Sequence, residues 1–249
     1  MNNNEIVETV TICMPVLNEK DVIKDVLMEW LEIIFKLPPG SKILIDEGGS
    51  QDGTIGIIEN LQNEYPGKIT VLFQTKPDGF GNSAKRLLNS SDGYWVFFTD
   101  SDGQYVAQDF WKLWNRRSEN DFIRGIKLGR QDPFIRRVAS LFWNKSVNFL
   151  FELPVHDVNA AFLLIRNHSL KKILPSVRIL PTMILSEIVI RCVLENLRFS
   201  RDIYINHRSR SFGKSRATPG LKFLFVGIRQ IKGLFEIKKD YRIANKEIN

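Results

Sequence analysis

Two aspartates separated by one serine are the sharpest chemical signal in this sequence. Asp100 and Asp102 follow an apolar run and precede Gly103 and Gln104. In an extended segment, residues i and i+2 point to the same side, so the two carboxylates converge. Such a pair is costly unless a cation neutralises it, and oxygen ligands suit Mg²⁺ or Mn²⁺. The spacing predicts metal binding by Asp100 and Asp102, with Gln104 as a further oxygen ligand, and a solvated turn is the alternative.

Three further apolar runs are each followed by a polar or glycine-rich loop. Asp46 and Glu47 come before two glycines, where the acid at a strand end contacts a ribose or base in many nucleotide-binding folds. The alternative is a helix N-terminus, where Ser50 or Asp52 caps the helix and acidic residues favour its dipole. Both interpretations can hold together. The three loops span residues 15–19, 46–54 and 76–81.

Two phosphate-binding patterns are weaker than they look. Gly213-Lys214-Ser215 resembles the end of a P-loop, but Arg208 stands where such a loop needs its first glycine. Residues 79–84 match the G-x-G-x-x-A pattern of dinucleotide-binding proteins, yet they follow the third expected strand and not the first. A tight turn before a helix explains the glycines equally well.

Basic residues cluster in the second half of the chain. Arg208, Arg210 and Lys214 lie within seven residues. Because guanidinium groups pair bidentately with phosphate oxygens, this cluster predicts a clamp on a diphosphate. A solvated basic face is the alternative. Asp157 follows Leu-Pro-Val-His and is a candidate general base, or a group that positions substrate or backbone.

Strand-like and helix-like segments alternate through the first hundred residues and would position these loops. The strands are expected at 10–14, 42–45, 69–73 and 94–98, with Pro15 ending the first, and the helices at 21–35, 54–65 and 82–89. Continuous apolar strands are typical of a sheet that is buried on both faces. The alternation predicts an α/β fold with a doubly wound, mostly parallel sheet.

Composition sets the outer limits of function. The chain has 249 residues and a net charge of +7, which suits an anionic substrate or an anionic membrane surface and does not demand nucleic acid. Two cysteines exclude a disulfide framework and favour a reducing, cytoplasmic compartment. Neither a signal peptide nor a transmembrane run is expected. Residues 217–249 read as an amphipathic basic helix that lies on a membrane or docks on the domain or on a second subunit.

The motifs occur in an order that resembles the family 2 glycosyltransferases of GT-A type. The resemblance rests on Met14-Pro-Val-Leu-Asn18-Glu19, residues 46–54, Gly79-Phe-Gly81 and Asp100-Ser-Asp102-Gly-Gln104. Downstream, residues 136–144 and 157–162, Glu187 and residues 208–215 are similar to the polyprenyl-phosphate branch, which includes dolichol-phosphate mannosyltransferases. Together these segments span roughly residues 10 to 216.

This resemblance implies a fold and a set of roles. It implies a GT-A domain over residues 1–216, divided into a nucleotide-binding half (1–104) and an acceptor-binding half (105–216), with a helical tail over 217–249. Metal ligation is implied for Asp100, Asp102 and Gln104. A cationic clamp is implied for Arg208, Arg210 and Lys214. The residues implied to line the donor pocket are Pro15, Asn18, Glu19, Asp46 or Glu47, Gly79 and Asp100.

The activity implied is a metal-dependent, inverting transfer of a sugar from a nucleoside diphosphate. The acceptor would be a polyprenyl phosphate or a lipid-linked or cell-surface glycan, at the inner face of the cell membrane. If the acceptor is a hydroxyl group, Asp157 is the candidate base. The alternatives are a non-catalytic subunit that binds nucleotide sugars and a sugar-nucleotide nucleotidyltransferase. A homodimer is among the expected partners.

Overall fold

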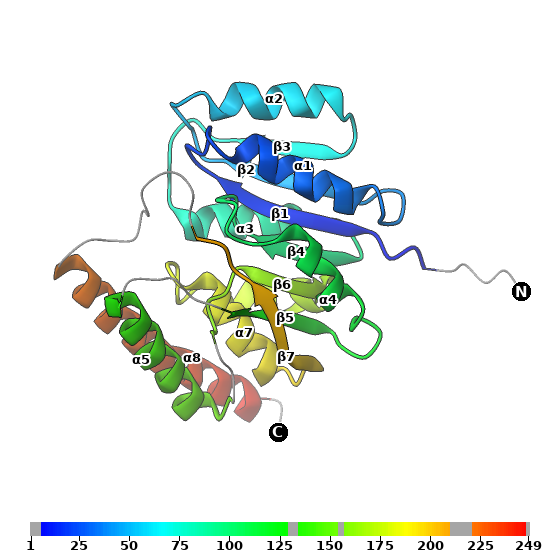
Figure 1. Ribbon diagram of the computed structural model, residues 1–249. Coiled ribbons are helices and arrows are strands. Elements are labelled where there is room, and N and C mark those ends of the chain that lie inside the picture. The colour runs from blue at the N-terminus through cyan, green and yellow to red at the C-terminus, as the bar shows by residue number, and fades with distance from the viewer. Residues whose placement is uncertain (1–5, 129–133, 154–156, 210–220, 248–249) are drawn as a thin grey trace, which may run out of the picture.

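A seven-stranded mixed sheet forms the centre of the molecule (Figure 1). The computed structural model describes residues 6–128, 134–153, 157–209 and 221–247. The strand order is β3-β2-β1-β4-β6-β5-β7, and β6 runs antiparallel to both of its neighbours while the other pairs are parallel. The strands are β1 (Val10–Val16), β2 (Lys42–Glu47), β3 (Ile69–Phe73), β4 (Trp95–Thr99), β5 (Phe122–Leu128), β6 (Phe162–Arg166) and β7 (Phe199–Asn206).

Helices cover both faces of this sheet. In Figure 1, α1, α2 and α4 lie on one side and α3 and α7 on the other, while α5 and α8 form a separate pair at the lower left. The α-helices are α1 (Ile23–Ile34), α2 (Thr54–Glu64), α3 (Phe80–Ser90), α4 (Phe110–Trp114), α5 (Phe134–Phe151), α6 (Asn167–Ile173), α7 (Ile184–Leu194) and α8 (Leu221–Glu247). Short 3-10 turns, η1 (Ala107–Asp109) and η2 (Leu174–Ser176), precede α4 and follow α6.

Aromatic side chains fill the core between β4 and the helices beside it. The Phe97 ring on β4 lies 5.2 Å from Trp30 of α1, 5.1 Å from Phe110 of α4 and 4.8 Å from Phe162 of β6. All five residues of β4 are buried. Because β4 and β6 pair directly, residues from the first and second halves of the chain share one sheet and one core. The predicted doubly wound sheet is confirmed, while the domain boundaries at residues 104 and 216 stay predictions.

The first two strands are longer than the sequence indicated. Strand β1 was expected to end at Pro15, but it continues to Val16 and pairs with β2 as far as Glu47. The Val16 carbonyl accepts a hydrogen bond from Gly48 on the β2 side. The backbone nitrogen of Pro15 therefore points toward β4 and not toward β2. Because the pairing of β1 with β4 has already ended at Cys13, the missing N–H of Pro15 costs the sheet no hydrogen bond. Consequently Asp46 and Glu47 lie inside β2 and not in the loop after it.

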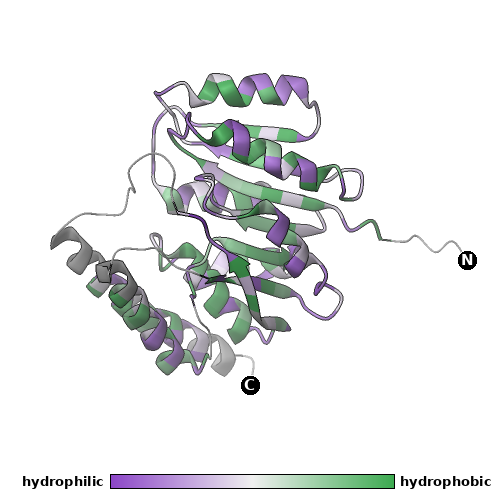
Figure 2. Cartoon of the chain, in the orientation of Figure 1, coloured by the Kyte–Doolittle hydropathy of each residue, from purple (hydrophilic) through white to green (hydrophobic). Residues whose placement is uncertain are grey.

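The C-terminal helix docks on the domain along one of its faces. Leu234 and Ile237 of α8 are fully buried, and Lys238 Nζ donates to the Leu150 carbonyl of α5 at 2.7 Å. A Cβ at Gly233 would lie 2.6 Å from Leu180, so the helix approaches the domain closely there. The coloured parts of α5 and α8 each carry both hydrophobic and hydrophilic residues (Figure 2). No helix within the described ranges is long and apolar enough to cross a membrane.

Candidate functional site

The loops after β1 and β2 are held together by backbone-to-side-chain hydrogen bonds. Asn18 adopts a left-handed φ of 46°, its N–H donates to Ser50 Oγ at 2.7 Å, and its Oδ1 accepts from the Gln51 N–H at 2.8 Å. The Glu19 N–H donates to Thr54 Oγ1 at 2.9 Å. Asn tolerates the left-handed region better than most residues. The two loops therefore form one rigid rim at the C-terminal edge of the sheet, where α/β folds bind ligands.

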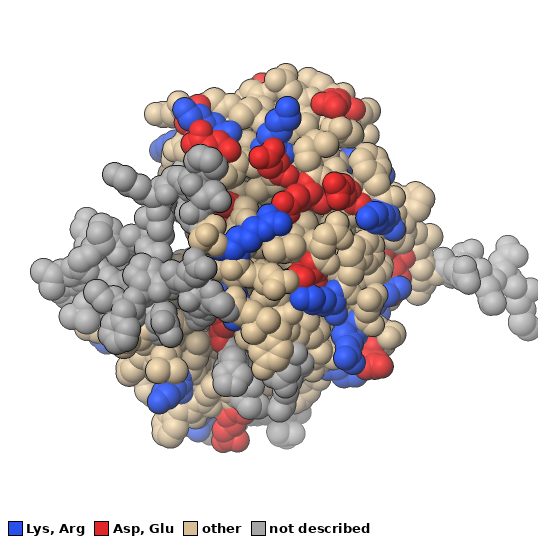
Figure 3. Space-filling model, in the orientation of Figure 1, with Lys and Arg blue, Asp and Glu red and all other residues tan. Residues whose placement is uncertain are grey.

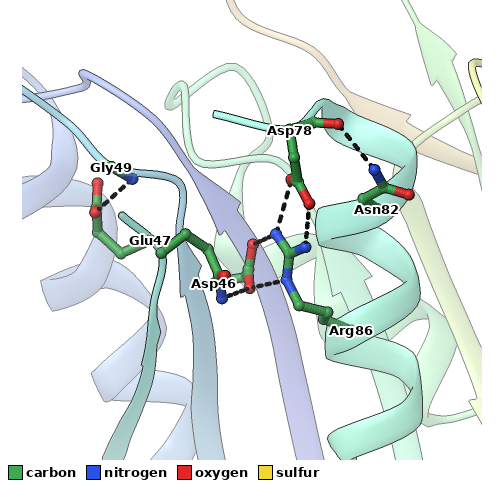
Figure 4. A network of polar contacts seen from close by, with 7 residues as sticks. Asp46, Glu47, Gly49, Asp78, Asn82 and Arg86 are labelled. Carbon is green, nitrogen blue, oxygen red and sulfur yellow. Dashed lines mark hydrogen bonds and ion pairs between the residues drawn. The ribbon is translucent and has the colours of Figure 1, made fainter. Parts of the chain in front are cut away.

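Glu47 shapes this rim from within. Its side chain is fully buried and accepts a hydrogen bond from the Gly49 N–H at 2.9 Å (Figure 4). It also accepts one from the Ser50 N–H at 3.0 Å. Gly49 has a φ of 82°, and a Cβ there would lie 3.0 Å from the backbone of Lys76. Backbone N–H donors satisfy a buried carboxylate that burial alone would penalise. In this structure Glu47 fixes the loop rather than facing an open pocket.

Asp46 is buried against an arginine that the sequence analysis did not single out. The Arg86 guanidinium of α3 contacts Asp46 through Nε and Nη2, each at 2.8 Å, and reaches Asp78 through Nη1 at 2.5 Å (Figure 4). Gln74 adds a hydrogen bond to Asp46 at 3.1 Å. Hydrogen bonds to Asp46 and Asp78 raise the pKa of Arg86 further above its ordinary value. Asp46, the residue expected to contact the ribose or base, is thus paired with the positive charge of Arg86.

The two aspartates of the Asp-Ser-Asp motif lie directly after β4, in the middle of the sheet. Asp102 Oδ1 accepts a hydrogen bond from the Gln104 N–H at 3.2 Å, so the turn chemistry of the alternative interpretation is present. Gln104 pairs with Arg208, because its backbone carbonyl accepts from the Arg208 N–H at 2.7 Å and its Nε2 donates to the Arg208 carbonyl at 3.2 Å. Its role as a metal ligand stays a prediction.

Tyr105 connects this motif to the loop that carries Asp157. The Ala161 N–H donates to the Tyr105 hydroxyl at 3.0 Å. Burial raises the pKa of Tyr105 well above its ordinary value, and the negative charges of Asp100, Asp157 and Asp102 act in the same direction. Tyr105 thus joins the segment after β4 to the loop of Asp157 through the Ala161 hydrogen bond. The role of Asp157 stays a prediction.

Arg124 on β5 is a buried cation beneath the same loop. Its side chain is 5% exposed and its Nη1 donates to the Asp157 carbonyl. Burial lowers the pKa of Arg124 to about 10, although the charge on Asp157 opposes this. Asp157 has a left-handed φ of 54°, and Asn144 of α5 accepts from the next residue's N–H at 2.9 Å. Arg124 and Asn144 thus fix the Asp157 backbone from two sides.

Arg208 is described in contact with α1. Its Nη1 lies 2.7 Å from Glu29 Oε1. Acidic side chains gather over α1 in the view of Figure 3. The other two cations expected in the clamp, Arg210 and Lys214, lie outside the described residues.

The two glycines after β3, Gly79 and Gly81, differ in how closely other atoms approach them. Gly79 is exposed, with a φ of 100°, just before α3. Gly81 is the second residue of α3, and the Pro181 carbonyl approaches the backbone closely there. Gly79 stays a predicted donor contact, whereas Gly81 has a packing role.

The donor set is compatible with a divalent ion only if part of the coordination comes from a ligand. Across the described ranges, no group of three or more His, Cys, Asp or Glu side chains is arranged to hold a metal. Mg²⁺ is commonly held by one or two carboxylates, with water and substrate phosphates completing the shell. Asp100 and Asp102 meet that requirement together with a bound diphosphate.

Several residues of this site escaped the sequence analysis. Arg124 carried a usable signal, since this charged residue stands among apolar residues in the first half of strand 122–128. Tyr105 and Arg86 carried none, because an aromatic residue after a turn and an arginine on a helix are ordinary. Glu187 matched a family position, and the structure shows its buried carboxylate accepting from the N–H groups of residues 178–180 at 2.7–3.1 Å. That arrangement fixes a loop.

Comparison with known proteins places these features in a family context. The model of glycosyl transferase family 2 matches residues 11–174. The chain is 23% identical over 175 residues to an undecaprenyl-phosphate 4-deoxy-4-formamido-L-arabinose transferase of Shewanella sediminis, covering 70% of this chain and 53% of that one. A protein of the same name from Yersinia enterocolitica is 24% identical over 229 residues, covering 87% and 64%. The chain thus spans about half to two thirds of the length of these relatives.

Solved structures agree on the fold. Glucosyl-3-phosphoglycerate synthase from Mycobacterium tuberculosis superposes with a TM-score of 0.68 at 16% identity, covering 92% of this chain and 78% of the other. The same enzyme has been crystallised with Mn²⁺, UDP and glucosyl-3-phosphoglycerate. These matches confirm the resemblance stated from the motifs and the expectation of a GT-A fold.

Proposed function

The chain belongs to glycosyltransferase family 2, and from this premise we propose that it moves a sugar from a nucleoside diphosphate to an acceptor, with inversion at the anomeric carbon. One observation carries the proposal. Asp100 and Asp102 lie at the end of β4, between the rim formed by the β1 and β2 loops and the loop of Asp157. Donor and acceptor would therefore meet above the centre of the sheet.

Asp100 and Asp102 would hold Mg²⁺ or Mn²⁺ against the diphosphate of the donor. A divalent ion supplies Lewis-acid stabilisation of the negative charge that develops on the departing nucleoside diphosphate. The protein's part is to fix two carboxylates on a rigid strand end so that no reorganisation is needed during the reaction. Buried Arg124 supports this arrangement, because its guanidinium donates to the Asp157 carbonyl and its positive charge interacts with Asp157.

The β1–β2 rim would hold the nucleoside. This rim includes Pro15, Asn18 and Glu19. Space for the donor also remains beside Gly79, just before α3, where even an added Cβ would meet no atom of the described residues within 4 Å. The acids on β2 would act in two ways. Glu47 would keep its role of shaping the loop, while Asp46 and Arg86 together would offer an acceptor and donors to the base or ribose.

We propose a polyprenyl phosphate as the acceptor. The curated relatives described above are named as transferases to undecaprenyl phosphate. An oxygen of the acceptor phosphate would attack the anomeric carbon as the bond to the donor diphosphate breaks, and because that oxygen is already anionic no base is required. Asp157 would then position the acceptor or the metal-binding loop. With a glycan hydroxyl as the acceptor, the same carboxylate would accept the proton.

Such a reaction would take place at the cytoplasmic face of the cell membrane, where nucleotide sugars and a lipid phosphate can meet. The cations of residues 208–214 would approach the diphosphate or the acceptor phosphate. No nucleic acid partner is proposed.

The proposal is tested by a transfer assay with matched variants. The purified chain is incubated with Mn²⁺, a panel of nucleoside diphosphate sugars and a short polyprenyl phosphate, and the sugar-lipid product is measured. Asp102→Asn is expected to lower turnover by about 10²–10³-fold, as for the loss of one preorganised electrostatic group. Asp92→Asn is the control, because that carboxylate pairs with Lys42 on the surface.

Each alternative has its own outcome. Unchanged Mn²⁺-dependent transfer by Asp102→Asn would refute the metal role. Binding of a nucleotide sugar with no transfer to any acceptor would favour a non-catalytic binding subunit. Formation of a nucleotide sugar from a sugar phosphate and a nucleoside triphosphate would favour a nucleotidyltransferase.

A further inference from the structure

A short segment before α7 is held in place by one buried carboxylate. Glu187 of α7 is fully buried and accepts hydrogen bonds from the consecutive N–H groups of residues 178, 179 and 180, at 3.1, 2.9 and 2.7 Å. Hydrogen bonds to an ionised acceptor are stronger than neutral ones, and a carboxylate buried without them would be costly. Glu187 therefore fixes the backbone of residues 178–181, which we call the 178–181 loop.

One end of the 178–181 loop lies against the first turn of α3. A Cβ at Gly81 would lie 1.9 Å from the Pro181 carbonyl oxygen, so only glycine lets the two backbones come this close. The same turn also packs against β4, where the rings of Phe80 and Phe98 meet edge to face with their centroids 6.1 Å apart. The start of α3 is thus held both by the loop and by the sheet.

Helix α3 carries contacts on which the donor site depends. Gly79 stands immediately before the helix, and Arg86, less than two turns further on, pairs with Asp46 of β2 at 2.8 Å (Figure 4). A hydrogen-bonded helix of this length moves as a rigid element. A shift at its first turn would therefore displace Gly79 and disturb the pair of Arg86 with Asp46.

The 178–181 loop also contacts α8. A Cβ at Gly233 would lie 2.6 Å from Leu180 Cδ2 and 3.2 Å from Ile179 Cγ2, so α8 packs closely on two side chains of the loop. Arg178 of the same loop reaches Asp240 of α8 at 3.2 Å. These four loop residues thus contact α3, α7 and α8 at once. Through them, the C-terminal helix is connected to a helix of the donor site.

We propose that Glu187 is a positioning residue for the donor site, and that the 178–181 loop couples the docking of α8 to donor binding. Glu187 acts through the loop, by keeping the Pro181 carbonyl against α3, and not on the donor itself. With α8 docked, the loop is supported and α3 stays where Arg86 meets Asp46. Displacing α8 releases the loop, and the donor then binds more weakly. The effect on the donor rests on the proposed sugar transfer, whereas the coupling of the helices does not.

Steady-state kinetics of the full chain test Glu187 first, with the nucleotide sugar of the panel that gives the most product. Glu187→Gln should raise the KM for that donor by about 2- to 30-fold, the range for a residue coupled to a site that it does not touch. The kcat should stay within about twofold of the parent value, because the reacting groups are unchanged. Glu187→Ala removes both acceptor oxygens and should raise the KM further.

A purely structural loss elsewhere serves as the control. Ser41 Oγ accepts a hydrogen bond from the buried Val10 N–H at 3.0 Å, at the edge of the sheet opposite to the site. Ser41→Ala should lower the Tm, because it leaves that N–H without its acceptor. It should leave the KM for the donor unchanged.

A pair of substitutions on α8 tests the coupling from the other side. Gly233→Leu should raise the KM for the donor with little change in kcat, because the added side chain pushes α8 and the 178–181 loop apart. Gly227→Leu on the same helix is the matched control, since a Cβ there would meet no atom of the described residues within 4 Å. The double variant Glu187→Gln/Gly233→Leu should raise the KM by less than the product of the two single effects, because both act through one loop.

Hydrogen exchange of the free chain separates the coupling from the proposed reaction. The amides of residues 83–88 in α3 are followed by mass spectrometry without donor or acceptor. Glu187→Gln and Gly233→Leu should each make these amides exchange at least about threefold faster, while Ser41→Ala and Gly227→Leu should not. If the parent chain transfers no sugar and α3 still responds to both variants, the proposed function fails and the coupling stands.

Three results would overturn the proposal. The first is an exchange rate of α3 that neither Glu187→Gln nor Gly233→Leu changes. The second, in a chain that transfers sugar, is an unchanged donor KM in both variants. The third is exchange that rises equally over the whole sheet, since this would reduce Glu187 to a general contribution to stability.

Discussion

The guanidinium of Arg208 lies 2.7 Å from the carboxylate of Glu29, so the first cation of the expected phosphate clamp is paired with helix α1. Both side chains are roughly half exposed, at 47% and 40%. Ion pairs with this exposure contribute only about 0.2–1 kcal/mol. The contact is therefore weak enough for a diphosphate to compete for the same guanidinium.

We expect Glu29→Gln to strengthen donor binding. Removing the carboxylate frees Arg208 for the diphosphate, and the energy of the exposed pair corresponds to a decrease of about 1.5- to 5-fold in the KM for the nucleotide sugar. Steady-state kinetics at low salt measure this, and the difference should shrink as salt is raised. Asp25→Asn, on the exposed side of the same helix, is the control. A KM that rises in Glu29→Gln would show that the pair supports donor binding.

Tyr105→Phe tests the connection between the Asp-Ser-Asp motif and the Asp157 loop. The substitution leaves the buried Ala161 N–H without the hydroxyl that accepts its hydrogen bond, at a cost of about 1–3 kcal/mol in unfolding free energy. Turnover should fall, because the loop of Asp157 is then less firmly held to the segment that follows the Asp-Ser-Asp motif. The pKa of Tyr105 is raised, so the phenol stays protonated and the pH–rate profile should keep its shape. A lost alkaline limb would instead assign the hydroxyl a role in proton transfer.

Asp121 should give the protein part of its stability above acidic pH. Hydrogen bonds from Arg198 hold the pKa of Asp121 below its ordinary value, and Arg166 adds to the effect. A carboxylate with a lowered folded-state pKa stabilises the fold above its unfolded pKa of about 3.9, and the gain is lost as pH falls through the lower value. Asp121→Asn should therefore have a lower Tm than the parent chain at pH 7. The difference in Tm between the two should shrink below about pH 4.

Thermal unfolding across that pH range measures the effect, with Glu119→Gln as a nearby exposed control. The result bears on the site because Asp121 anchors the start of β7, the strand that leads to Arg208. A deficit of constant size at every pH would mean that the charge of Asp121 is not its source.

The first half of the fold was predictable because its elements carry strong local signals. The expected strand 69–73 matches β3 residue for residue, and the expected helix 21–35 encloses α1. The predicted positions were wrong where a charged residue is buried because a distant residue or a backbone N–H group pairs with it. Asp46 and Glu47 are charged and were placed in a loop, but Arg86 and the N–H groups of residues 49 and 50 let them sit buried in β2.

The second half of the site depends on contacts between distant segments, and periodicity does not report these. The hydrogen bond from Ala161 to Tyr105 joins residues 56 positions apart, and the Arg208–Glu29 pair joins residues 179 positions apart. The motif order indicated that Asp157 and Asp100 belong to one site. It could not indicate that the buried Arg124 would donate to the Asp157 carbonyl.

Gly81→Ala should be strongly destabilising, although alanine favours helices. A Cβ at this position of α3 would lie 1.9 Å from the Pro181 carbonyl oxygen, and that loop is itself fixed by the buried Glu187 carboxylate. Backbone cannot move aside cheaply, so we expect a loss of about 2 kcal/mol or more in unfolding free energy, measured by urea denaturation. Gly56→Ala on α2 is the matched control, because a Cβ there meets nothing within 4 Å and should stabilise the fold by about 0.5–1 kcal/mol. Equal stability of the two variants would mean that the 178–181 loop is free to shift away from α3, in which case donor binding at the neighbouring Gly79 should also tolerate the change.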